Sequence, residues 1–411
     1  MSVARKRILV GIFWIAAAAT SLAAGINAAG TVWASVNPGL ALRLAPANGK
    51  ALSRTFDADV LARANVSALA GPDAQQWQAK ARKALRGDPL QAGALRVLAF
   101  TSGDTTGKAA EMGAGPALTR LSERVSRRDL ITQMWLIEDA VSRESIPEAL
   151  QHYDKALSVH PEIGARLFPI LTDALDQPEI RQGLVSYLRS DRPWAVTFLL
   201  NAAQNATRPL DVVRLFTDYG GSRAVPAHRS IETLLLQHLV ATGNIPEAAR
   251  YAHVMAGNHA SALSAVDFTS QTINPALRPF TWLLSNDTAA SASFDPARGV
   301  SISVDPGNRA VVASRVMLLA PGQWRFGYTA ELPPISSMSK MQWDLECVGQ
   351  SGASLASLQV PVQTGVASYG ADFAVPNGCP AVVFNLTAAG TDGMEASGAT
   401  VRSLTLTRLR D

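Results

Sequence analysis

Residues 134–161 read MWLIEDAVSRESIPEALQHYDKALSVHP, and this stretch decides how the helical part of the chain folds. Apolar residues recur there at helical spacing on either side of a polar turn, which predicts two short helices joined by a tight loop. Four residues of the second half lie 4, 3 and 5 residues apart: Ala149, Tyr153, Ala156 and Pro161. Alanines at this spacing let two helices approach closely, the aromatic ring fills the gap, and the proline ends the second helix. The stretch therefore predicts a helical hairpin.

A second stretch repeats this pattern. Residues 242–257 read TGNIPEAARYAHVMAG, in which Ala248 and Ala252 keep the interval of 4 residues. The tetrapeptide Ile-Pro-Glu-Ala occurs at 146–149 and again at 245–248, a separation of 99 residues, or three periods of 33. Proline in the first turn followed by glutamate is an ordinary helix start, so the tetrapeptide alone means little. Together with the alanine spacing and the interval, it predicts an array of helical repeats.

On these residues the sequence resembles the tetratricopeptide-repeat family, whose unit is a helix–turn–helix of about 34 residues. One departure is Ile137, which stands where the first helix of that repeat normally has a glycine. The resemblance implies that residues 37–270 form a solenoid of about six or seven helix pairs, most of them degenerate. It also implies a concave face that binds protein partners, because such pairs stack to bury their apolar faces and leave that surface open.

The N-terminus has the composition of a membrane anchor. Residues 1–7 carry three basic side chains, and residues 8–29 form a run of 22 with no charged side chain. As a helix this run is about 33 Å long, enough to cross a hydrocarbon core of roughly 30 Å. A cleaved signal peptide is the alternative, because Ala-Ala-Gly at 23–25 is a possible cleavage pattern. The positive-inside rule predicts a single-pass inner-membrane protein with a cytoplasmic N-terminus and its bulk outside the cytoplasm.

The character of the sequence changes between residues 271 and 280. Beyond this boundary, residues 277–411 show alternating apolar and polar residues broken by Gly and Pro turns. About eight short strands fit this layout, which predicts an antiparallel β-sandwich of jelly-roll type and makes the whole chain a multidomain α + β protein. The chain's two cysteines, Cys347 and Cys379, both lie here, and in an oxidising compartment they are expected to form a disulfide. Two buried free thiols are the alternative.

Two segments of this region resemble the jelly rolls of carbohydrate-binding modules and galactose-binding-type domains: LLAPGQWRFGYTAEL at 318–332, interpreted as a hairpin, and ATVRSLTLTRL at 399–409. The resemblance implies glycan binding, in which aromatic side chains stack on sugar rings. The candidates are four aromatic residues: Trp324, Tyr328, Trp343 and Tyr369. The alternation around Trp324 and Trp343 also fits core packing, whereas Tyr369 is expected in a glycine-flanked loop.

Composition and motifs argue against nucleic-acid binding and against catalysis. The formal net charge is only +4, and the basic residues at the N-terminus supply most of it, so no nucleic-acid partner is expected. The sequence has no GxSxG elbow, no HExxH motif and no Cys/His cluster, so neither an enzyme nor a metal or cofactor site is expected. Two carboxylate pairs leave catalysis open as an alternative: Glu138 with Asp139, and Asp344 with Glu346.

The order of anchor, degenerate repeats and sandwich is similar to that of tetratricopeptide-containing envelope proteins associated with bacterial exopolysaccharide production. This similarity implies a non-catalytic scaffold that binds other envelope proteins through its repeats, contacts polysaccharide, and is held in the membrane by residues 8–29. Two other functions remain open. One is a carbohydrate-active enzyme with an α/α catalytic domain and an accessory sandwich. The other is an adaptor for secretion or cell-wall assembly that binds no glycan.

Overall fold

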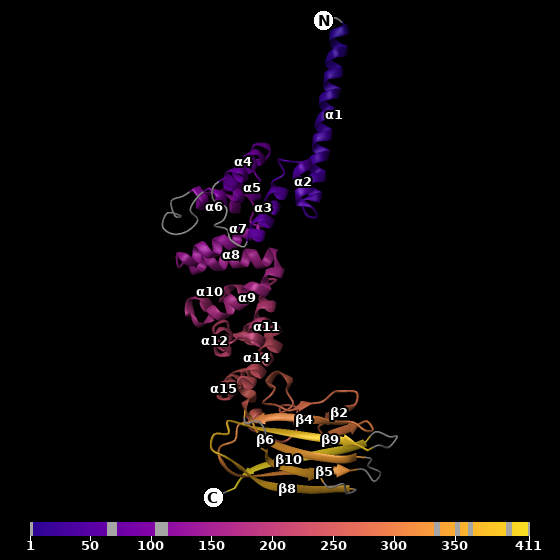
Figure 1. Ribbon diagram of the computed structural model, residues 1–411. Helices are drawn as coiled ribbons and strands as arrows, with labels where there is room; N and C mark the ends of the chain where they lie inside the picture. Colours follow the sequence, from indigo (N-terminus) through magenta and orange to yellow (C-terminus); the bar gives the residue numbers. More distant parts are fainter. Residues whose placement is uncertain are drawn as a thin grey trace. The chain divides into compact units, whose positions relative to one another are not determined.

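The structure is a computed structural model that describes residues 3–63, 72–102, 114–332, 338–349, 354–360, 365–391 and 397–409, without the side chains of residues 3–16, 27, 60–63, 72, 114, 338–339 and 397. The chain divides into two compact units, Met1–Gly164 and Ala165–Asp411. The first unit is helical, and the second contains both helices and strands (Figure 1).

The described residues of the first unit form eight α-helices: α1 (Val3–Trp33), α2 (Pro38–Leu44), α3 (Gly49–Arg63), α4 (Pro72–Gly87), α5 (Ala92–Thr101), α6 (Ala114–Val125), α7 (Leu130–Ser142) and α8 (Ile146–Val159). The sequence Gly-Asp-Pro at 87–89 separates α4 from α5, as expected of residues that favour turns. Phe56 of α3 and Trp77 of α4 pack edge to face, with ring centroids 5.3 Å apart. These two rings lie in the apolar core formed by α3, α4 and α5.

The predicted anchor, residues 8–29, lies within α1, which is one continuous helix of 31 residues. The side chains of residues 3–16 are outside the described set. In the part of the chain that the structure does describe, no helix combines the length and the apolar character needed to cross a membrane.

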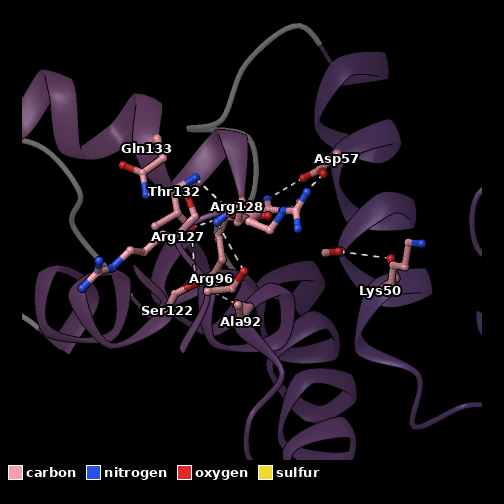
Figure 2. Close-up of polar contacts among 12 residues, drawn as sticks. Lys50, Asp57, Ala92, Arg96, Ser122, Arg127, Arg128, Thr132 and Gln133 are labelled. Carbon is pink, nitrogen blue, oxygen red and sulfur yellow. Dashed lines mark hydrogen bonds and ion pairs between the residues drawn. The ribbon is translucent and has the colours of Figure 1, made fainter. Parts of the chain in front are cut away.

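A buried arginine joins three helices of the first unit, and Figure 2 marks its contacts. Arg96 of α5 is 1% exposed and donates two hydrogen bonds to Asp57 of α3, at 2.6 Å and 3.0 Å. Its Nε lies 2.8 Å from Oδ2 of Asp129. The same oxygen accepts a hydrogen bond from the backbone N–H of Thr132 and so caps α7. One guanidinium therefore connects α3, α5 and the start of α7.

The second unit begins with seven α-helices in its described part: α9 (Gly164–Asp173), α10 (Pro178–Arg189), α11 (Ala195–Asn205), α12 (Pro209–Tyr219), α13 (Gly221–Ala224), α14 (Arg229–Ala241) and α15 (Ile245–Ala256). Phe198 of α11 packs against Phe168 of α9, with ring centroids 5.7 Å apart. Gly220 ends α12 with a φ of 92°, a left-handed conformation that glycine adopts at little cost. A 3-10 turn at Gly257–Leu263 follows α15.

Ten strands follow in the described residues: β1 (Leu283–Leu284), β2 (Ala290–Asp295), β3 (Gly299–Val304), β4 (Arg309–Met317), β5 (Gly322–Leu332), β6 (Met338–Cys347), β7 (Ser354–Val360), β8 (Gly365–Val375), β9 (Val382–Gly390) and β10 (Ser397–Arg408). They form two five-stranded sheets, in the orders β1-β4-β9-β6-β7 and β2-β3-β10-β5-β8. The sheets stack face to face (Figure 1), and buried residues alternate with more exposed ones along β5 and β9. The predicted antiparallel β-sandwich is confirmed.

Aromatic side chains fill the space between the sheets. Phe326 of β5 lies at the centre, with its ring centroid 5.1 Å from that of Trp343 and 5.3 Å from that of Phe384. Cys347 at the end of β6 is bonded to Cys379, which precedes β9, and this confirms the predicted disulfide. The bond closes the end of the β6–β9 pair, where Cys347 is the register partner of the first residue of β9.

The prediction that residues 318–332 form a hairpin is wrong. β4 pairs with β1 and β9, whereas β5 pairs with β10 and β8, so the two strands belong to different sheets. Pro321 has no N–H to donate to a strand ladder, and Gly322 has a φ of 133°, which glycine adopts far more readily than other residues. These two residues therefore carry the chain from one sheet to the other.

Replacing Arg96 with methionine is expected to destabilise the first unit by about 3 kcal/mol, because Asp57 and Asp129 would keep their charges without their buried partner. Urea unfolding followed by circular dichroism measures the loss. Arg124→Met, on an exposed position of α6, is the matched control and is expected to leave the unfolding free energy nearly unchanged. Equal losses in the two variants would contradict the role assigned to Arg96.

Candidate functional site

The residues of the predicted repeat signature are mostly buried, on helices that belong to packed pairs. On α8, which packs against α7, the buried signature residues are Ala149, Tyr153 and Ala156. Pro161 begins the 3-10 turn that follows α8. On α15, which packs against α14, Ala248 and Ala252 are both buried. All of these side chains except that of Pro161 are therefore buried within the two helix pairs, and the repeat itself stays a prediction.

The two helix pairs turn in the same way. In the first pair the N–H of Ser145 donates to the carbonyl of Ala140 at 2.8 Å, and in the second the N–H of Asn244 donates to the carbonyl of Leu239 at 2.8 Å. The residue before each donor has a positive φ, 57° at Glu144 and 80° at Gly243. This is the Schellman form of helix ending, in which a left-handed residue redirects the chain.

A buried polar contact crosses each pair at the same place. In the first pair, Nδ1 of His152 lies 2.7 Å from Oε1 of Gln133. In the second, the hydroxyl of Tyr251 donates to Oε1 of Glu232 at 2.7 Å. The partners are 19 residues apart in both pairs, and the offset between the pairs is again 99 residues, both from Gln133 to Glu232 and from His152 to Tyr251. Sequence reasoning missed this correspondence because the residue types differ.

The second contact belongs to a larger buried cluster. Glu232 is buried, and its Oε2 has no hydrogen-bond partner among the described residues, while the hydroxyl of Tyr219 lies 3.1 Å from Nδ1 of His228. Burial raises the pKa of both Tyr219 and Tyr251, and the nearby Glu232 carboxylate adds to each shift. Burial also lowers the pKa of His228. At neutral pH the tyrosines therefore stay protonated and His228 stays neutral, which suits structural hydrogen bonds.

The side chain of Arg315 attaches the end of the helical region to the sandwich. It projects from β4 between the sheets and is 1% exposed. Its Nε donates to the carbonyl of Phe280 at 2.9 Å, and its terminal nitrogens donate to three further carbonyls, those of Ala262, Leu263 and Ala265. All four acceptors lie in the segment between α15 and β1. Burial lowers the pKa of Arg315 to about 10, so the group remains charged at neutral pH.

A groove of about 420 Å³ lies where α15 and this segment meet the sandwich. His253 lies on the α15 side, Trp324 and Leu406 lie on the sandwich side, and Phe280 and Met317 supply further apolar lining. The volume falls within the range of roughly 300–1,000 Å³ that is usual for small-molecule sites. The indole N–H of Trp324 donates to the carbonyl of Ala320 at 2.9 Å, which fixes the ring. The Trp324 side chain is partly buried and also packs against the core of the sandwich.

For two of the four residues, the prediction of glycan binding is wrong. Trp343 is 0% exposed and Tyr328 is 3% exposed, because both occupy inward-facing positions between the sheets. Burial raises the pKa of Tyr328 to about 12, and Tyr369 contributes to the shift. Tyr369 is also not in a loop: it lies on the edge strand β8 opposite Tyr328, with ring centroids 5.5 Å apart. Of the four, Trp324 alone lines the groove.

In each of the two predicted carboxylate pairs, one carboxylate is bound by neighbouring side chains and the other is exposed. Asp139 forms ion pairs with two arginines, at 3.0 Å and 2.9 Å, while Glu138 beside it is exposed. Asp344 accepts a hydrogen bond from a serine of β7 at 2.9 Å, and Glu346 is exposed. Among the described residues, no group of three or more His, Cys, Asp and Glu side chains is placed to hold a metal ion.

The sequence matches no protein-family model, and no curated protein is significantly similar to it. Many solved structures are similar to part of the chain, and three of them, which each cover 31% of it, illustrate the similarity. A family 61 carbohydrate-binding module in complex with beta-1,4-galactotriose is 13% identical over 88% of its length, with a TM-score of 0.24. A family 6 module from Cellvibrio mixtus lichenase 5A in complex with cellotriose is 10% identical over 92% of its length, with a TM-score of 0.22. The enzymatically active domain of tailspike protein 4 from bacteriophage CBA120 is 13% identical over 19% of its length, with a TM-score of 0.23.

The free energy of unfolding of the first unit is expected to fall as the pH drops from about 6.5 towards 5. Burial lowers the pKa of His152, so below its ordinary pKa the unfolded state binds more protons than the folded state. His152→Gln removes this group and is expected to make the pH dependence shallower, as urea titrations at several pH values would show. His259→Gln, at an exposed position, is the control. Parallel pH profiles for wild type and His152→Gln would count against a buried neutral histidine.

Replacing Arg315 with methionine is expected to destabilise the second unit by about 3 kcal/mol or more, because four carbonyls lose their donor. Thermal unfolding of the full chain measures the loss. Arg325→Met is the matched control on the same sandwich, since Arg325 forms an exposed ion pair with Asp372 at 2.6 Å, and its loss is expected to be much smaller. If the control were as damaging as Arg315→Met, the attachment would not depend on this guanidinium.

Proposed function

We propose that the chain is a non-catalytic, membrane-anchored envelope scaffold that acts in the biogenesis of a surface or exported polysaccharide. Its helical repeats bind other envelope proteins, and its sandwich, of the carbohydrate-binding jelly-roll type, contacts the glycan. The anchor is the uncharged run at residues 8–29, with the N-terminus in the cytoplasm and the bulk of the chain outside it.

The observation that carries the proposal is the correspondence between the helix pairs α7–α8 and α14–α15. Their small interface residues, their turns and their buried polar contacts all recur at an offset of 99 residues. A recurrence at this level of detail supports a repeat of tetratricopeptide type, and such repeats stack to form an extended surface for a protein partner. Three cavities lined by described residues, one of them the groove beside Trp324, each have at most one carboxylate in the lining.

The groove beside Trp324 supports the contact with glycan. A pyranose ring has an apolar face of C–H groups, and an aromatic ring with a fixed orientation is a suitable surface for that face. His253 supplies a polar group on the opposite wall, which can hydrogen-bond a sugar hydroxyl. The chemistry of the groove therefore suits one sugar unit of a polymer.

Deleting the gene in the native host tests the function as a whole. The deletion is expected to reduce the amount of polysaccharide exported to the surface, and a plasmid copy of the full chain is expected to restore it. Unchanged export in the deletion strain would contradict the polysaccharide pathway and would favour an adaptor that binds no glycan.

Trp324→Ala is expected to weaken binding of the detergent-solubilised full chain to the host polysaccharide by at least about tenfold, which corresponds to about 1.4 kcal/mol. Affinity electrophoresis in gels that contain the polysaccharide measures the change. Val366→Ala is the control, because Val366 is exposed on β8 and is not part of the groove lining. If the folded Trp324→Ala chain kept its full affinity, the proposal that the groove binds the polysaccharide would be contradicted.

A further inference from the structure

Exposed apolar side chains cluster between residues 22 and 44. Eighteen large apolar residues are exposed in the described part of the chain, and seven of them lie in this short interval: Leu22, Ile26, Val32, Trp33, Val36, Leu40 and Leu44. The exposed fractions of Leu22, Val32 and Val36 are 67%, 69% and 78%. Single exposed apolar residues are normal on a protein surface, but a contiguous set indicates a surface that is covered by something else.

We use the name collar for five of these residues: Val32, Trp33, Val36, Leu40 and Leu44. They follow the uncharged run and occupy the last turn of α1, the turn after it, and α2. The collar therefore continues the apolar surface of α1 beyond the predicted anchor and onto a second helix.

The end of α1 is fixed to the next two helices by small side chains. Ala34 of the turn after α1, Ala41 of α2 and Ala51 of α3 are each 0% exposed and form one small core. Gly30 lies so close to α2 that a Cβ there would be 2.7 Å from the Cβ of Ala45. The side-chain amide of Asn48 also donates to the hydroxyl of Thr31 at 3.0 Å. Because α1 is packed on this side, the collar is a surface of a built helical corner and not of a loose end.

The charge of this region indicates what covers the collar. Residues 30–56, which include the collar, contain three basic residues and no acidic residue. Arg43 of α2 and Lys50 of α3 are exposed, and Arg54 donates to the backbone carbonyl of Ser35. Exposed basic residues beside an apolar surface suit the anionic headgroups of a bilayer.

The length of α1 sets the depth of the collar. If residues 8–29 span the hydrocarbon core, Trp33 lies four residues beyond the run, or about 6 Å further along the helix. That depth is the headgroup region, where tryptophan is enriched in membrane proteins. We infer that the collar inserts into the lipid interface of the bilayer that α1 crosses, so that α2 lies in the headgroup layer and holds the first unit against the membrane. This inference rests on the proposed anchor.

Site-specific lipid quenching in the full chain tests the inference. The two native cysteines are bonded to each other, so an introduced cysteine can be labelled selectively with an environment-sensitive fluorophore. Leu44→Cys reports on the collar, Leu22→Cys on the anchor, and Gln75→Cys, at an exposed position of α4, is the control. The chain is reconstituted into vesicles of phosphatidylethanolamine with a minority of phosphatidylglycerol, with and without spin-labelled lipid.

The expected result is strong quenching by spin-labelled lipid at positions 22 and 44 and little at position 75. Quenching at position 22 without quenching at position 44 would overturn the collar while leaving the anchor in place. A chain that does not remain with the vesicles, or that shows no quenching at position 22, would overturn the anchor and the inference together. A blue-shifted label at position 44 that lipid does not quench would show that protein, and not lipid, covers the collar.

Discussion

The guanidinium of Arg315 is the contact on which the arrangement of the second unit depends. Moving a cation from water into the space between two sheets is costly unless its donors are satisfied. Here main-chain carbonyls satisfy them, and those carbonyls belong to the segment that joins α15 to β1. The buried carbonyls of the segment require hydrogen-bond donors, and the buried guanidinium requires acceptors, so each satisfies the other. The indole N–H of Trp282 adds a further contact, to the carbonyl of Val266 at 2.8 Å, so α15 and the sandwich enclose a groove of fixed geometry.

The first unit uses the same kind of side chain in a different way. Arg96 is as deeply buried as Arg315, but it faces two carboxylates, which contact it from α3 and from the start of α7. In that unit one guanidinium is shared by two carboxylates, and the geometry of the fork joins helices that the chain does not connect directly. A buried arginine thus organises each unit, once through ion pairs and once through backbone carbonyls. In both arrangements, removal of the arginine would leave its partners without their donor. The loss of stability would therefore be larger than the net stability that the arginine contributes.

The sequence predicts those features that depend on local patterns. Helical spacing predicted the pair α7–α8, strand alternation predicted the sandwich, and the only two cysteines predicted the disulfide. Features that depend on distant partners were missed. The placement of β4 and β5 in different sheets follows from pairing with strands far along the chain, such as the contact of Ser314 with Asn385, 71 residues away. The partners of Arg315 are carbonyls, which have no signature in the sequence, and His152 and Tyr251 occupy equivalent places with different side chains.

The burial of Tyr328 and Trp343 limits how the chain can bind a polysaccharide under the proposed function. With those rings in the core, the groove offers one lining tryptophan and one histidine, so a single sugar unit would gain few contacts and would bind weakly. A polymer presents the same unit many times, and copies of the chain held in one membrane can engage it at many points. The overall affinity for the polymer would then be high, although each single contact would dissociate quickly. Such binding would let a growing chain of sugars stay near the membrane while it moves, which suits a scaffold for export better than a tight receptor.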